Sequence, residues 1–81
     1  MSASRARAVV EAIAKALAER PESVSVGERE ARGQTFLELT MAPGDMGRVI
    51  GRQGRTAQAV RTLATLAAEM DGAKVSVDFR D

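Results

Sequence analysis

Residues 47–63 read GRVIGRQGRTAQAVRTL, and this stretch holds three glycines, of which Gly51 and Gly54 stand three apart inside an otherwise helix-like run. A glycine in a helix interior costs about 1 kcal/mol relative to alanine. The spacing G-x-x-G therefore predicts a tight turn between two helices, with a backbone that another backbone can approach closely. Because the N–H groups that begin a helix favour an anion, this turn is a candidate phosphate site.

The charge of the chain is concentrated around this turn. The net charge is only +1, but between Gly44 and Arg61 there are four arginines, and Asp45 is the only acid. A local basic patch on a nearly neutral protein is typical of a phosphate binder. The alternative interpretation of the same residues is a solvated surface that carries arginines.

Two nucleotide-binding motifs do not match this stretch. A P-loop requires G-x-x-x-x-G-K-[ST], and its alignment on the second glycine places Val49 at its first glycine and Arg55 at its lysine. A dinucleotide fingerprint requires G-x-G-x-x-G after a strand, whereas this chain has G-x-x-x-G-x-x-G after an expected short helix. Both motifs are excluded.

The composition argues against catalysis. The chain contains no histidine and no cysteine, which excludes Ser-His-Asp and Cys-His nucleophiles and the common zinc sites. The acids are scattered and form no convincing acid–base pair, so we expect no enzymatic activity, no metal and no cofactor. No apolar run approaches the roughly 18 residues of a membrane span, and the first residues lack a signal-peptide core. These absences predict a cytoplasmic protein.

The hydrophobic periodicity predicts one α+β domain over residues 1–81, with the order α-β-β-α-α-β and three helices on one face of a three-stranded sheet. Helices are expected at about Ser4–Arg20, Asp45–Ile50 and Thr56–Met70, and strands at Ser23–Val26, Thr35–Met41 and Lys74–Arg80. Ser4 and Asp45 are the expected N-caps. The segment from Gly27 to Gln34, GEREARGQ, is charged and carries two glycines, so it is expected to be a loop.

Three apolar sets are expected to face the core. They are Leu37, Leu39 and Met41 in the second strand, Val75, Val77 and Phe79 in the last strand, and Ala59, Val60, Leu63, Leu66, Ala67 and Met70 in the last helix. The only other aromatic residue, Phe36, alternates with Leu37 and is expected on the opposite face of the sheet.

The stretch GRVIGRQGRTAQAVRTL resembles the signature of KH domains, in which an apolar pair precedes a G-x-x-G loop between two helices and an amphipathic helix follows. The predicted element order resembles the type II, or prokaryotic, KH topology. The length and the near absence of any additional sequence resemble the small bacterial single-KH proteins of the KhpA family. The resemblance covers essentially the whole chain.

This resemblance implies that the protein binds single-stranded RNA, as an RNA chaperone or a post-transcriptional regulator. In KH domains the G-x-x-G loop clamps the backbone of about four nucleotides. Carried over to this chain, the RNA-binding residues are Arg48, Val49, Ile50, Gly51, Arg52, Gln53, Gly54 and Arg55. In this set Arg52 and Gln53 reach phosphates, while Val49 and Ile50 form the floor of an apolar groove. Leu37 and Leu39 are candidates for the facing wall.

The residues limit the expected mode of binding. The chain has no tryptophan or tyrosine, so stacking of bases on aromatic rings is not expected to dominate. GEREARGQ would correspond to the variable loop of a KH domain and mixes acids with bases. Few phosphate contacts predict an affinity of about micromolar or weaker, with appreciable salt dependence. Single-stranded DNA stays open as an alternative ligand, because a backbone clamp does not by itself read the 2′-hydroxyl.

The alternative function is a protein-interaction module. The resemblance implies self-association, or pairing with a larger KH-domain protein, through the helix that follows the loop. Val60, Leu63 and Leu66 are candidate contacts for such a dimer, and their alternative interpretation is core packing against the sheet.

Overall fold

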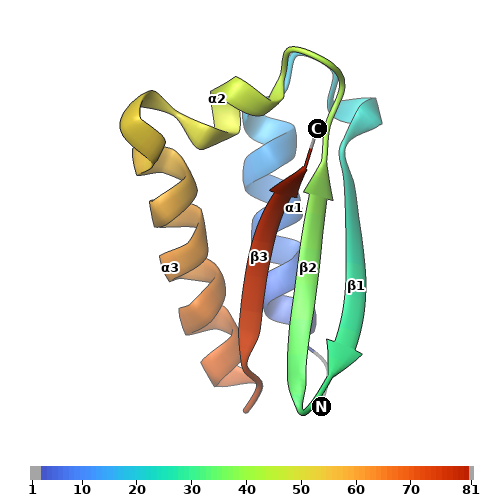
Figure 1. The fold of residues 1–81 in the computed structure, drawn as a ribbon, viewed down its shortest axis with the longest axis vertical. Helices are drawn as coiled ribbons and strands as arrows, with labels where there is room; N and C mark the ends of the chain where they lie inside the picture. Colours follow the sequence, from blue (N-terminus) through green and yellow to red (C-terminus); the bar gives the residue numbers. More distant parts are fainter. Residues whose placement is uncertain (1–2, 81) are drawn as a thin grey trace.

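The computed structural model describes residues 3–80. The chain forms, in order, α1 (Ser4–Leu17), η1 (Pro21–Ser23), β1 (Ser25–Ala31), β2 (Gln34–Thr40), α2 (Met46–Ile50), η2 (Arg52–Gly54), α3 (Arg55–Met70) and β3 (Val75–Arg80). Figure 1 shows a sheet of three strands with α1 behind it, α3 beside β3, and α2 across one end. The α-β-β-α-α-β order and the α+β class are confirmed. No helix within this described range is long and apolar enough to cross a membrane.

The sheet is mixed, with β2 in the centre. β1 pairs with β2 in antiparallel fashion and β3 pairs with β2 in parallel. Parallel strands need a long crossover, and here α2, η2 and α3 together form the connection from β2 to β3. The G-x-x-G stretch therefore lies within this crossover.

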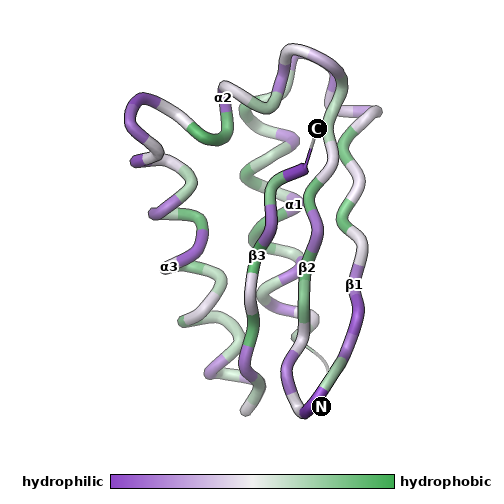
Figure 2. Tube along the Cα trace, viewed as in Figure 1, coloured by the Kyte–Doolittle hydropathy of each residue, from purple (hydrophilic) through white to green (hydrophobic). Residues whose placement is uncertain are grey.

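The expected loop over GEREARGQ is wrong, because most of this segment is strand. β1 extends to Ala31, and only Arg32 and Gly33 form the turn, with φ of 54° and 75°. Two residues of positive φ make the tight hairpin that matches the twist of the strands. Charged residues are tolerated in β1 because it is an edge strand, and they appear as the purple part of β1 in Figure 2. No extended variable loop exists here.

The core lies between the sheet and the helices. Leu37, Leu39 and Met41 are buried as expected, and Val77 is buried with them, whereas Phe79 is only half-buried. Phe36 lies on the opposite face of β2, where the Arg29 guanidinium carbon is 4.6 Å from the centre of its ring. The predicted alternation along β2 and β3 is therefore confirmed, and the arginine covers the aromatic ring on the face without helices.

α1 and α3 pack directly against each other through small side chains. The buried residues are Ala6, Val10 and Ala14 in α1 and Ala57, Val60, Ala64 and Ala68 in α3. At the end of this contact, the backbone N–H of Arg5 donates to Asp71 Oδ2 at 3.1 Å and its side chain forms an ion pair with the same carboxylate. The start of α1 thus lies beside the end of α3.

The stripe predicted to be buried in α3 is largely wrong. Val60 is buried and Ala67 half-buried as expected, but Ala59 is exposed. Leu63, Leu66 and Met70 are also exposed, to 48%, 54% and 72%. Alanines let the two helix backbones approach closely, so the small residues turn inward and the larger ones remain outside.

The ends of the first helix and the predicted caps also differ from expectation. α1 ends at Leu17 rather than Arg20, and β1 begins at Ser25 rather than Ser23, because Pro21 starts a short 3-10 turn. Ser4 is the first helical residue and not the N-cap. Asp45 does precede α2, but its carboxylate caps no helical N–H. It accepts the backbone N–H of Arg20 at 3.0 Å instead and ties the start of α2 to the segment after α1.

Candidate nucleic-acid interface

The turn at Gly51 requires a glycine for two separate reasons. Gly51 ends α2 with φ 76° and ψ 175°, a backbone region that is essentially confined to glycine. A Cβ at this position would also lie 2.8 Å from Cβ of Thr56 and still closer to its hydroxyl. The backbone nitrogen of Thr56 would also be close, at 3.1 Å from that Cβ. The first glycine of the motif is therefore needed to close the turn itself.

The second half of the turn is open to its surroundings. Gln53 has φ 58° and ψ 24°, and Gly54 has φ 73° and ψ 15°, so two successive residues adopt the left-handed conformation. A Cβ at Gly54 would meet no atom within 4 Å. Gly54 is the N-cap of the 16-residue helix α3, and no side chain caps the first turn of that helix. The positive end of the α3 dipole is thus presented at an exposed turn.

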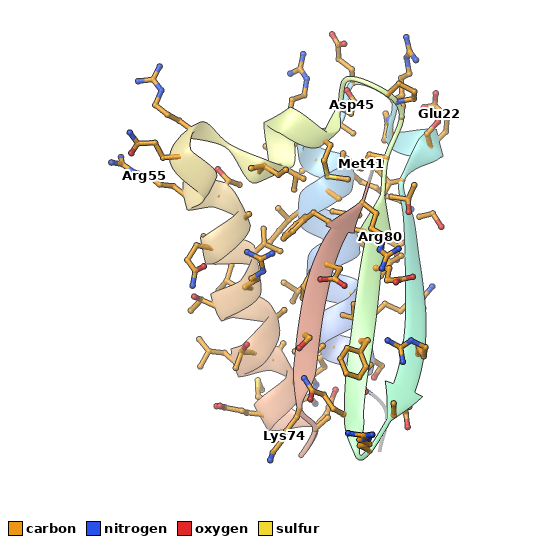
Figure 3. All side chains as sticks on the ribbon, in the orientation of Figure 1. Glu22, Met41, Asp45, Arg55, Lys74 and Arg80 are labelled. Carbon is orange, nitrogen blue, oxygen red and sulfur yellow. The ribbon has the colours of Figure 1, made fainter. Side chains whose placement is uncertain are left out.

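The arginines of the predicted site fall into two groups. Arg52 and Arg55 are exposed, and no acid among residues 3–80 forms a salt bridge with either of them. Arg55 donates a hydrogen bond to the Gln53 side-chain oxygen at 3.2 Å. Arg48, in contrast, is paired with Glu19 at 3.3 Å and lies 3.8 Å from Asp45. The strongest positive potential is therefore expected at the tip of the loop, where Figure 3 shows Arg55.

Three apolar residues predicted to line the groove are core residues instead. Val49, Leu37 and Leu39 are each 0% exposed, so they cannot contact a ligand on the surface. β2 is the central strand, and the helices cover the face that carries its leucines. Val49, in the five-residue helix α2, is likewise buried in the core. Ile50 is half-buried and packs against the core. Of the four apolar residues predicted to line the groove, it is the one that retains some accessible surface.

A hollow lies between α3 and β3, and we refer to it as the groove. It has a volume of about 270 Å³ and is lined by Arg61, Thr65, Val75, Ser76, Val77 and Asp78. A second hollow of about 230 Å³ follows the exposed side of α3 and shares Arg61 and Thr65 with the first. The wall that faces α3 is therefore β3, an edge strand, and not β2 as predicted. The sequence offered one indication of this wall, because β3 is the strand that directly follows α3.

Arg61 is the functional candidate that the sequence analysis missed. It belongs to the basic segment between Gly44 and Arg61, but it is not among the predicted RNA-binding residues. Its Nε donates to the carbonyl oxygen of Val77 at 3.3 Å, and its guanidinium carbon lies 4.9 Å from the centre of the Phe79 ring. It therefore connects α3 to β3 and lines the hollow between them.

A larger hollow, of about 440 Å³, lies at the start of α2 beside Met41, which is labelled in Figure 3. Its lining residues are Met41, Pro43, Gly44, Met46 and Gly47, and none is charged. Such a lining offers an anionic ligand no charged partner, so the loop and the hollow between α3 and β3 are the better candidates for the interface. Among residues 3–80, no three acidic side chains converge in a way that could hold a metal ion.

The three predicted dimer contacts differ in how deeply they are buried. Val60 is 2% exposed and belongs to the α1–α3 contact, so its assignment as a surface contact is wrong. Leu63 and Leu66 are about half exposed and lie with Met70 on one side of α3. We refer to Leu63, Leu66 and Met70 as the outer apolar stripe.

The mixed sheet, the helices on one of its faces and the G-x-x-G turn between α2 and α3 define a type II KH domain. A family model described as the KH domain of KhpA and KhpB matches residues 7–79. The chain belongs to this KhpA/KhpB KH-domain family.

Individual relatives agree with this assignment. The chain is 47% identical over 71 residues to the RNA-binding protein KhpA of Caldanaerobacter subterraneus subsp. tengcongensis, with 88% of this chain and 95% of the relative covered. The KhpA protein of Clostridium perfringens is 46% identical with the same coverage. The KhpA protein of Chlamydia muridarum is 42% identical over 69 residues, which cover 85% of this chain and 88% of the relative. Each of these proteins carries the name RNA-binding protein KhpA.

Proposed function

We propose that this chain binds single-stranded RNA through residues 51–55 and acts as an RNA chaperone or a post-transcriptional regulator. The observation that carries the proposal is the pair Arg52 and Arg55, which have no acidic partner among the described residues and flank a glycine turn at the start of α3. The names of the relatives support RNA as the ligand.

The geometry suggests how the strand would lie. Phosphates would sit at the turn, where Arg52, Gln53 and the uncapped first turn of α3 provide donors. Bases would then follow the hollow between α3 and β3, past Arg61 and Thr65. The outer edge of β3 adds backbone groups that pair with no other strand among residues 3–80. Arg48 would contribute less than predicted, because Glu19 and Asp45 already neutralise it.

The absence of histidine and cysteine supports a binding protein and not an enzyme. We propose that the protein works in the cytoplasm without a cofactor. We expect an affinity of about micromolar or weaker for a single domain, and single-stranded DNA is the natural competitor ligand to include in any test.

The test is fluorescence anisotropy with short labelled single-stranded RNAs, matched DNA and double-stranded RNA. The double variant Arg52→Asp, Gln53→Asp should lose RNA binding while it remains folded by circular dichroism. Arg52→Asp and Arg32→Asp change the net charge by the same amount. Arg32 serves as the control because it lies in the β1–β2 turn, at the opposite end of the molecule (Figure 1). Equal losses in this pair would show that net charge, and not the loop, controls binding.

We also infer that the chain pairs with a second copy of itself or with another KH-domain protein. The observation in favour is the outer apolar stripe, because three large apolar side chains on one exposed face of a helix mark an interaction surface. A second domain would raise the effective concentration of the first at the RNA. Sedimentation of the wild type and of a Leu63→Gln, Leu66→Gln variant tests this. A wild type that sediments as a monomer without any partner domain present would exclude the homodimer.

A further inference from the structure

The Arg61 side chain is held in place on two sides. Its Nε donates to the carbonyl oxygen of Val77 at 3.3 Å, and Val77 lies in the edge strand β3. Its guanidinium carbon lies 4.9 Å from the centre of the Phe79 ring, two residues further along the same strand. A guanidinium group that lies over an aromatic ring and is bonded to a carbonyl has little rotational freedom left. Arg61 therefore presents a planar group in a defined place.

The Arg61 side chain also borders the groove. Arg61 is an exposed residue, and it lines both of the hollows that meet along α3. Within the described part of the chain, no carboxylate forms a salt bridge with it and no acceptor takes a hydrogen bond from its two terminal nitrogens. Phe79 is half-buried and packs against the core, so its ring supports the guanidinium from beneath.

We propose that Arg61 is a stacking platform for one base of the bound strand, with Phe79 as its backing; this proposal rests on the single-stranded nucleic-acid binding proposed above. Bases splayed from a single strand stack on guanidinium planes as they do on aromatic rings. Every base has a π-face, so the contact tolerates any base. The chain has no tryptophan or tyrosine, and Arg61 supplies the stacking surface that those residues provide elsewhere.

The experiment separates stacking from charge and from a purely structural role. The wild type and Arg61→Lys are titrated with an RNA hexamer and with the same hexamer lacking all its bases, at low salt. Lysine keeps the positive charge but has no plane. We expect Arg61→Lys to bind the normal hexamer about tenfold more weakly, in line with the usual loss of one base-stacking contact. On the abasic hexamer the two proteins should bind equally, and the slope of affinity against salt should not change.

Two further variants complete the design. Arg32→Lys is the matched control, and it should change neither hexamer's binding by more than about twofold, because Arg32 lies in the β1–β2 turn, away from the loop and the groove. Phe79→Leu keeps an apolar side chain in the core but removes the backing ring, and it should reproduce the loss that depends on the bases. Thermal unfolding by circular dichroism checks that each variant is folded.

The outcomes are distinct. An equal loss on both hexamers would mean that Arg61 contacts phosphate or only ties α3 to β3, and it would overturn the proposal. Unchanged binding of Arg61→Lys to the normal hexamer would also overturn it, while the proposed function would stand if the Arg52→Asp, Gln53→Asp variant still lost binding. If the wild type bound neither hexamer, the proposed function itself would fail, and the role of Arg61 with it.

Discussion

The G-x-x-G turn directly precedes α3 and the outer apolar stripe lies on that helix, but the two obey different rules. At the turn, the backbone conformation restricts the residue type, as Gly51 and Gly54 both have φ above 70°. On the stripe, Leu63, Leu66 and Met70 lie on a regular helix, whose backbone conformation does not require one particular residue type. A backbone conformation that requires glycine can be recognised in the sequence from the glycines themselves. The exposure of a side chain depends on what packs against the helix, so the sequence predicted the turn and misplaced the stripe.

The largest effect should come from the first glycine of the turn. Gly51→Ala places a Cβ in a backbone region that costs about 1–3 kcal/mol for a residue other than glycine, and this Cβ also clashes with Thr56. We expect a loss of about 3 kcal/mol or more in the free energy of unfolding, measured by urea denaturation. Thr56→Gly in the same background should recover the part caused by the clash. A loss below about 1 kcal/mol would show that the turn can adopt another conformation.

The two sides of α3 should respond differently to truncation. Val60→Ala removes buried methyl groups from the α1–α3 contact, where Val60 is 2% exposed, and should cost about 2 kcal/mol of unfolding free energy. Leu63→Ala, at a position 48% exposed, should cost less than about 1 kcal/mol but should weaken self-association. Thermal unfolding and sedimentation of both variants make the comparison. A larger stability loss for Leu63→Ala in the dilute monomer would contradict the packing described here.

The second glycine should matter less than the first. Gly54→Ala puts a Cβ into open space, so only its left-handed conformation, with φ 73°, is strained. The expected cost is about 1 kcal/mol. Gly54→Asn is the matched control, because asparagine tolerates this conformation better than alanine. Urea denaturation of the two variants would refute this explanation if they were equally destabilised.

The smallest effect concerns the arginine that is already paired. Glu19→Gln removes the 3.3 Å ion pair with Arg48, and Glu19 has a side chain that is 71% exposed. Arg48 then keeps only Asp45 as an acidic neighbour, so RNA affinity should rise by about twofold and the salt slope by at most about 0.7. Anisotropy titrations over a range of salt measure both. Glu22→Gln, at a nearby acid that forms no salt bridge within residues 3–80, is the control. An equal rise in that variant would attribute the effect to overall charge.

Local rules explain which predictions succeeded. The helix after the turn, the alternation in β2 and β3 and the two loop glycines follow from periodicity and from backbone conformation, which depend on neighbouring residues. The prediction for the segment GEREARGQ failed because its charges suggested a loop, whereas most of it pairs with β2 as an edge strand of the sheet. That pairing joins residues distant enough in sequence that composition did not reveal it.

The amino-acid sequence was sufficient for the element order, the position of the turn and the excess of arginine around it, because each depends on residues within a few positions of one another. Burial required the assembled fold. Val49, Leu37 and Leu39 turned out to be core residues, and the groove wall turned out to be β3. In α3, alanines and leucines repeat at the same helical spacing, and periodicity cannot rank them. The alanines of α3 face α1, since only small side chains fit where two helix backbones pack closely together.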